Sequence, residues 1–171
     1  MAAAVSFVLG NIYLVLFAIA VVTSFVKIRR ASNRGKPLGA AYIAWGELLF
    51  YAFGIWFVLA GLLHAYAQGF VAPKIGWQPS PFEYELGWIE IPTGIVAMMA
   101  LWRGFEFRLA ATIVLATFTL AAAAQHLQEM FCCANYAPSN AGPVLWFADV
   151  FMPLLLIVLA FLARDASSRR M

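Results

Sequence analysis

The sequence predicts an all-α membrane protein, a compact bundle of five transmembrane helices with the N-terminus outside and the C-terminus in the cytoplasm. Of its 171 residues, 64% are hydrophobic and only 11% are charged, whereas roughly a quarter of the residues of a soluble domain are charged. The mean hydropathy is +0.86. Five segments are each apolar over about 20 residues, the length that a helix needs to cross a bilayer.

In chain order, the helices are expected at residues 5–26, 40–67, 82–102, 107–131 and 144–163. The first is not expected to be a cleavable signal peptide, because it lacks a positive leader and its basic cluster follows the apolar stretch. Pro143 suits the first turn of the last helix. No repeat or soluble domain is visible, so residues 1–171 are expected to form one bundle.

The orientation follows from the positions of lysine and arginine, which gather on the cytoplasmic side of a membrane protein. Ten of the eleven such residues fall at one end of the predicted bundle, and only Lys74 falls at the other. The ten are Lys27, Arg29, Arg30, Arg34, Lys36, Arg103, Arg108, Arg164, Arg169 and Arg170. The net charge of +3 therefore lies beside helix ends, and no nucleic-acid partner is expected.

Most polar residues of the predicted spans lie near the outer boundary. At about 1.5 Å of rise per residue, five of them lie within about 10 Å of it: His64, Glu85, His126, Glu129 and Asp149. A carboxylate inside a bilayer is costly and usually faces a partner or a water-filled cavity. These side chains come from four helices, and bundles build metal and cofactor sites from facing helices in this way.

Three further glutamates are treated separately. Glu83 is expected at the water boundary, and Glu90 lies about one turn deeper than Glu85 and about 140° around the helix from it. Glu47 belongs to the cytoplasmic half, where it could bond across helices or pair with Arg34 or Lys36 of the loop.

The predicted site has no lysine or arginine inside the membrane to balance its acids. Either some carboxyls are protonated, or a cation is bound. A divalent metal, zinc, iron or manganese, fits imidazole and carboxylate ligands. The predicted ligands are His64, Glu85, His126 and Asp149, with Glu129 and Glu90 orienting them. The two histidines would also permit haem, provided that a macrocycle fits between their helices.

Cys132 and Cys133 are adjacent, and no CxxC or zinc-type spacing occurs. Vicinal cysteines rarely form a disulfide with each other, because the small ring is strained. They are expected to be two small residues at a helix end, with a metal or redox role as the alternative.

Several motifs have a familiar order. They are His64, Ile75–Gly76–Trp77, Ser80–Pro81–Phe82, Glu85, Gly87, His126, Asn135, Ala137–Pro138, Asn140–Ala141–Gly142 and Asp149. This pattern resembles a family of small, uncharacterised bacterial membrane proteins that is distantly similar to the DoxX-like four-helix proteins. The resemblance covers most of the chain after residue 40. It implies a multi-helix protein of the bacterial inner (cytoplasmic) membrane, and it implies no established activity.

The sequence therefore predicts where a functional site lies, without predicting a specific reaction. The first hypothesis is a metal or redox centre that opens to the periplasm, with loop 68–81 as a lid. The alternatives are a small-ligand or proton binding or transport protein, an accessory subunit of a larger membrane complex, and an intramembrane isomerase that uses paired carboxyls. Besides the lipid bilayer, a membrane-protein partner or a second copy is possible. No catalytic residue is assigned, and whether the protein is an enzyme stays open.

Overall fold

The computed structural model describes residues 11–34 and 39–168, and in these ranges the chain is helical with no strand. The α-helices are α2 (Ile12–Asn33), α3 (Ala40–Glu47), α4 (Trp56–Tyr66), α5 (Gln68–Ile75), α6 (Pro81–Met99), α7 (Phe105–Cys133), α8 (Pro138–Ala141) and α9 (Met152–Ser168). Two π-helical segments, η1 (Leu48–Ile55) and η3 (Val144–Phe151), and a 3₁₀ turn, η2 (Ala100–Trp102), continue helices in the same direction.

In this part of the chain, four helical stretches are long and apolar enough to cross a membrane. They are Ile12–Asn33, Ala40–Tyr66, Phe105–Cys133 and Val144–Arg164. The predicted third span corresponds to α6, which has three glutamates within its first ten residues and lacks this profile. The start of the first predicted helix, at Val5, lies outside the described residues, as do Lys36, Arg169 and Arg170.

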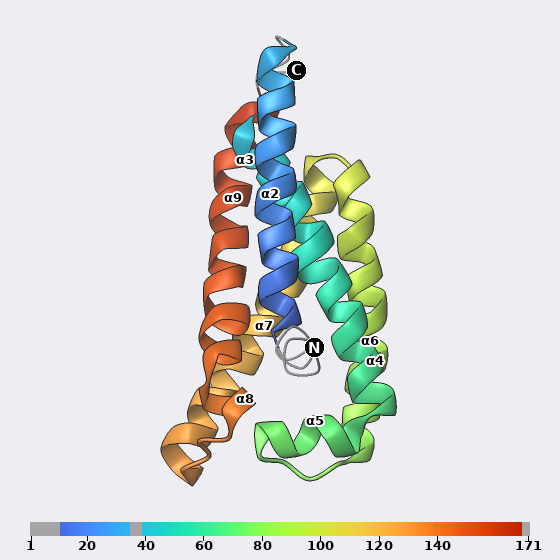
Figure 1. Ribbon diagram of the computed structural model, residues 1–171, viewed down its shortest axis with the longest axis vertical. Coiled ribbons are helices and arrows are strands. Elements are labelled where there is room, and N and C mark those ends of the chain that lie inside the picture. Colours follow the sequence, from blue (N-terminus) through green and yellow to red (C-terminus); the bar gives the residue numbers. More distant parts are fainter. Residues whose placement is uncertain (1–10, 35–38, 169–171) are drawn as a thin grey trace, which may run out of the picture.

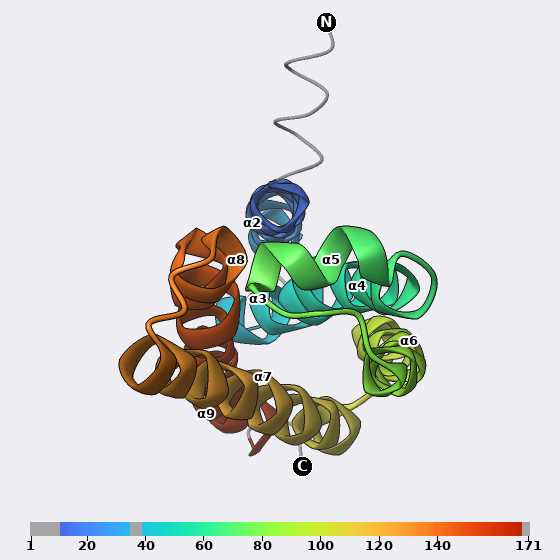
Figure 2. The same cartoon turned by 90° about the horizontal axis from the view of Figure 1, so that it is seen from below.

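The long helices lie roughly side by side, and short helices cover one end of them (Figure 1). Viewed from that end, α5 crosses the bundle from α4 toward α8 (Figure 2). The connections α2–α3 and α6–α7 and the end of α9 lie at the opposite end. Described cations such as Arg30 and Arg103 belong to these segments at the opposite end.

The connections 68–81 and 132–143, whose proline, glycine, asparagine and serine residues are typical of turns, contain the helices α5 and α8. The apolar residues Phe70, Val71 and Ala72 sustain α5, and Ala72 is fully buried. The helix ends where Gly76 takes a left-handed conformation with φ of 84°, which favours glycine. Composition alone missed α5 because turn-forming residues occur both inside the helix, at Gly69 and Pro73, and in the segment 76–80 that follows it.

The continuous helix η1–α4 packs backbone against backbone on α6 through glycines spaced by seven residues, Gly54 of η1 and Gly61 of α4 on one side and Gly87 and Gly94 of α6 on the other. Gly61 of α4 faces Gly87 of α6, and a Cβ atom at Gly87 would lie only 2.5 Å from the Gly61 carbonyl oxygen. Gly54 and Gly94 form a similar contact, in which a Cβ atom at Gly94 would lie 2.6 Å from the Gly54 carbonyl oxygen. Small residues allow such close approach in membrane helices.

The core lies nearer the end opposite α5 and includes the fully buried Trp45, Leu49, Leu115 and Leu156. The indole Nε1–H of Trp45 donates a hydrogen bond of 2.9 Å to the hydroxyl of Thr112. This bond fixes α3 against α7 within an otherwise apolar environment.

We expect Thr112→Val to lower the free energy of unfolding by about 1–2 kcal/mol, because the buried indole N–H of Trp45 would lose its acceptor. Thr93→Val is the matched control, since the exposed Thr93 bonds only to Ile89 of its own helix. Denaturant unfolding in detergent measures both. Equal midpoints for the two variants would contradict the assigned role of Thr112.

Two charged groups hold the helices together at the end opposite α5. The buried Arg108 guanidinium donates hydrogen bonds to the carbonyl oxygens of Tyr42 (2.6 Å), Ala100 (2.9 Å) and Leu101 (2.8 Å). Glu47, which is 1% exposed, accepts a bond of 2.5 Å from Lys27 of α2. Of the two alternatives for Glu47, bonding across helices is confirmed, because Lys27 belongs to α2 and Glu47 to α3. Arg34 forms no ion pair with Glu47, and Lys36 lies outside the described residues.

Candidate functional site

His64 and Glu90 meet where the glycine contact brings α4 and α6 together. Nδ1 of His64 lies 3.1 Å from Oε2 of Glu90, with 16% and 8% of the two side chains exposed. The distance is that of an ion pair, but neither atom has a hydrogen-bond partner with acceptable geometry. We regard the pair as a close electrostatic contact without hydrogen-bond geometry, so His64 Nδ1 and Glu90 Oε2 are each free to bind a proton or another group.

Glu83 is the third member of this group. It lies seven residues before Glu90 on the buried face of α6, and only 7% of it is exposed. Its Oε1 atom is buried without a hydrogen-bond partner, and the carboxylate interacts electrostatically with His64 and Glu90. We call His64, Glu83 and Glu90 the acid–imidazole cluster. The expectation that Glu83, at the water boundary, is solvated is wrong, because Glu83 lies on the face of α6 whose glycines pack against α4.

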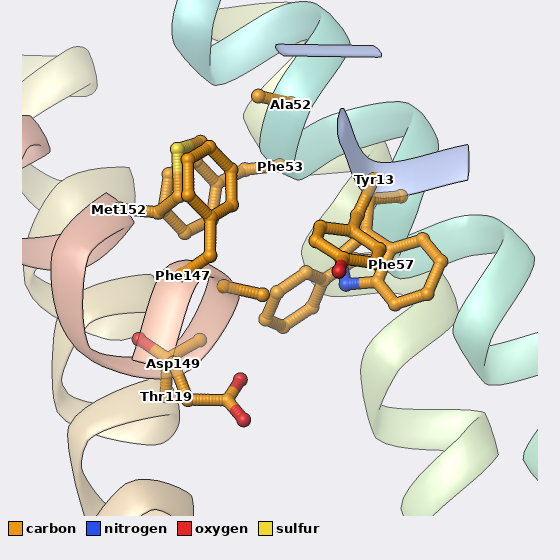
Figure 3. A pocket seen from close by; sticks show the side chains of 10 residues that line it. Tyr13, Ala52, Phe53, Phe57, Thr119, Phe147, Asp149 and Met152 are labelled. Carbon is orange, nitrogen blue, oxygen red and sulfur yellow. The ribbon is translucent and has the colours of Figure 1, made fainter. Parts of the chain in front are cut away.

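Asp149 belongs to a neighbouring pocket. Its carboxyl group lies near enough to Glu90 for electrostatic repulsion between them. The pocket is lined by Tyr13, Ala52, Phe53, Trp56, Phe57, Thr119, Phe147, Ala148, Asp149 and Met152. In Figure 3, Asp149 and Thr119 occupy one corner of the lining, with Tyr13 and Phe57 on the other side. The space available to a water-sized molecule is about 10 Å³, enough for about one water.

Both π-helical segments contribute to this pocket. Ala52 and Phe53 come from η1, and Phe147, Ala148 and Asp149 come from η3. Pro153, the second residue of α9, has no N–H to donate to the carbonyl of Asp149, so a regular α-helix would lose one hydrogen bond at this turn. π-Helical turns occur frequently at functional sites, which makes the Asp149 pocket a second candidate beside the acid–imidazole cluster.

His126 and Glu129 lie elsewhere, in contacts that tie down the short helices. Nδ1 of His126 lies 2.7 Å from Oδ1 of Asn140, and its ring stacks on Trp77. Asn135 donates bonds to Glu129 Oε2 (3.0 Å) and to the carbonyl oxygen of Ile75 (2.9 Å). Asn140, fully buried, also donates to the carbonyl oxygen of Asn135 at 2.7 Å. These contacts join α5, α7 and α8 into one cap.

The four predicted metal ligands are thus distributed over different places. His64 belongs to the acid–imidazole cluster, Asp149 to the neighbouring pocket and His126 to the cap, while Glu85 is exposed on another side of α6. Within residues 11–34 and 39–168, no group of three or more His, Cys, Asp or Glu side chains is arranged to hold a metal ion. Metal and haem binding stay predictions.

Composition and depth did not identify Glu83 as a site residue, but its spacing from the glycines of α6 indicates that it is buried. Glu83, Gly87, Glu90, Gly94 and Ala97 follow one another at intervals of four and three residues, and all five are buried. This is one face of a helix, and its glycines indicate close contact with a neighbouring helix. Two acids on a glycine face are therefore expected in a helix interface rather than in lipid.

Cys132 and Cys133 end α7, and both are exposed and free. Their sulfur atoms lie 2.7 Å apart without a disulfide bond. They belong to neither the acid–imidazole cluster nor the Asp149 pocket, so we assign them no part in the site.

Comparison with known proteins gives one match. Residues 10–169 match the model of a family of unknown function, DUF6790. No curated protein and no solved structure matches the chain. The motif order implied membership of a family without an established activity, and this match agrees with that. A functional proposal therefore depends on the geometry of the candidate site.

Proposed function

We propose, for a chain that belongs to the DUF6790 family of unknown function, that it is a membrane protein that takes up and releases a proton at the acid–imidazole cluster. The observation that carries this proposal is the 3.1 Å separation of His64 Nδ1 and Glu90 Oε2 in a buried interface. Imidazole and carboxyl groups in membrane interiors serve proton relays in pumps and transporters. The protein would then be a proton-coupled binding or transport protein.

The charges around the cluster support this proposal. Two carboxyls, Glu83 and Glu90, share one imidazole, and Asp149 adds a third acid nearby. Among the described residues, the ion pairs are Lys27–Glu47 and His64–Glu90, so no lysine or arginine pairs with these acids. Several negative charges in a low-dielectric interior repel one another strongly, and proton uptake relieves that repulsion.

The membrane arrangement belongs to the same proposal. α6, the third helix in chain order, would cross the membrane too and bring the number of spans to five, held against α4 by the glycine contacts. The N-terminus would lie outside and the C-terminus in the cytoplasm of a bacterial inner membrane. The gathering of cations at the end opposite α5 supports this orientation. The cluster would then lie near the periplasmic face, beneath α5 and the cap.

Infrared difference spectra of the purified protein, recorded between acid and alkaline pH, test proton binding directly. We expect a protonated-carboxyl band in the wild type that disappears in Glu90→Gln, which removes the titratable group with little change in size. Glu85→Gln is the matched control, because Glu85 is exposed on the same helix. A band that survives Glu90→Gln, or that Glu85→Gln removes equally, would refute the assignment.

A bound divalent metal is the second candidate. The observation that favours it is the set of three buried atoms without hydrogen-bond partners, His64 Nδ1, Glu83 Oε1 and Glu90 Oε2. They would require a small side-chain rearrangement to ligate one ion, because no such group is preformed among the described residues. Near-stoichiometric zinc, iron or manganese in the purified protein, lost in His64→Ala but kept in His126→Ala, would support this candidate over proton binding.

A further inference from the structure

The Asp149 pocket has the chemistry of a site for a small cation. Five of its ten lining side chains are aromatic, namely Tyr13, Phe53, Trp56, Phe57 and Phe147. The Tyr13 ring lies 5.9 Å from both Trp56 and Phe147, and it is tilted to each by 58° and 49°. These rings come from three different helical segments, α2, α4 and η3, and all line the same pocket. Ring faces attract cations, most strongly where water is excluded.

Asp149 supplies the negative charge. Within the described part of the chain, no lysine or arginine forms an ion pair with it, and the charged group that interacts with it electrostatically is the acid Glu90. An uncompensated carboxylate in a membrane interior requires a proton or a cation. The pocket places such a carboxylate beside aromatic rings instead of beside a basic side chain.

The remaining polar atoms favour a ligand that donates hydrogen bonds. The Thr119 hydroxyl donates to the carbonyl oxygen of Leu115 at 2.8 Å, so its lone pairs are left to accept a bond from the pocket. Side-chain oxygens in the lining come only from Tyr13, Thr119 and Asp149. Inorganic cations need several oxygens to replace their hydration shell, whereas an ammonium group needs a few acceptors and tolerates aromatic walls.

Size narrows the ligand further. The space of about 10 Å³ for a water-sized molecule admits an ammonium ion, which is about as large as water, or the –NH₃⁺ end of a primary amine. We propose that the pocket formed by Asp149, Thr119 and the surrounding aromatic rings binds ammonium or a small primary ammonium group. The site is distinct from the acid–imidazole cluster and does not depend on proton exchange there.

Thermal unfolding of the purified full-length protein in detergent tests the site. Ammonium chloride and methylammonium chloride are compared with potassium chloride and tetramethylammonium chloride at equal ionic strength. We expect the first two to raise Tm by on the order of 4 °C at about ten times the dissociation constant. An equal rise with potassium would overturn the proposal as a general salt effect, and an equal rise with tetramethylammonium would overturn the size limit on which it depends.

Variants identify the residues. Asp149→Asn should abolish the ammonium-specific rise, while Glu106→Gln, which removes an exposed acid from α7, should retain it. Phe57→Leu keeps an apolar side chain but removes a ring, and it should weaken ammonium binding roughly fivefold. An unchanged response in folded Asp149→Asn, or in Phe57→Leu, would overturn the proposal. The infrared test measures protonation of Glu90, and the thermal unfolding test measures ammonium binding at Asp149. Failure of the proton-binding proposal is therefore distinguishable from failure of the ammonium proposal.

Discussion

Gly87→Leu is expected to disrupt the packing of α4 against α6 and to lower the free energy of unfolding by about 3 kcal/mol or more. A Cβ atom at this position would meet the Gly61 carbonyl oxygen at 2.5 Å and the Ala65 backbone nitrogen at 2.6 Å. Both obstacles are backbone atoms, so no rotamer change can make room. The helices must separate, and His64 and Glu90 would separate with them. The protonated-carboxyl band assigned to Glu90 should therefore change in whatever folded fraction remains.

The control for this substitution is Gly69→Leu, because no atom lies within 4 Å of a Cβ added at Gly69. Its midpoint of unfolding in detergent should stay within about 0.5 kcal/mol of the wild type. Gly87→Ala should fall between the two variants. If Gly87→Leu unfolds at the same denaturant concentration as Gly69→Leu, the close backbone contact between α4 and α6 is refuted.

Arg108→Leu is expected to produce the second large loss, on the order of 3–5 kcal/mol. Three carbonyl oxygens, on Tyr42, Ala100 and Leu101, would lose charged donors at once. In a membrane-embedded bundle, water is scarce as a replacement partner. The guanidinium also lies 3.9 Å from the centre of the Tyr42 ring, and that contact would be lost too.

Arg108→Lys distinguishes charge from shape. Lysine keeps the charge but not the planar arrangement of donors that reaches several acceptors at once, so most of the loss should remain. Arg103→Leu is the control, since Arg103 is exposed and its guanidinium lies 5.9 Å from the Phe107 ring; it should cost less than about 1 kcal/mol. An Arg108→Lys protein as stable as the wild type would refute the role assigned to the guanidinium.

Much of the helical framework was accessible from the sequence. Long apolar segments bounded by cations and turn residues predict spans. Three of the predicted spans, 40–67, 107–131 and 144–163, agree with Ala40–Tyr66, Phe105–Cys133 and Val144–Arg164 to within about two residues at each end. That α6 also crosses the membrane stays a prediction, because its three glutamates, which made it a candidate for the site, lower its hydropathy below that of the four other long helices. A single sequence predicts that a helix exists more reliably than how it is rotated about its axis.

The rotation of each helix about its axis determines which side chains belong to the candidate site. Glu83 and Glu85 are two residues apart, which is about 200° around a helix, so one is buried when the other is exposed. Depth alone ranked Glu85 above Glu83, and the glycine face of α6 reverses that order. His126 had a partner that no helix spacing predicts, because Asn140 reaches it through the turn after α7. Asp149 stays a predicted site residue, and the aromatic side chains around it come from segments distant in the sequence, which no local pattern predicts.

The backbone contact between α4 and α6 also has a mechanical consequence. With glycine against glycine, backbone atoms of the two helices are in direct contact, and the side chains of Ile91 and Met98 pack onto Gly61 and Gly54. His64 and Glu90 are therefore mounted on one stiff two-helix unit, and their spacing should persist through any working cycle. On the proton-exchange proposal, a conformational change that admits protons would therefore have to come from a neighbouring segment such as α5, which is joined to this unit at Ala67 and by the segment 76–80.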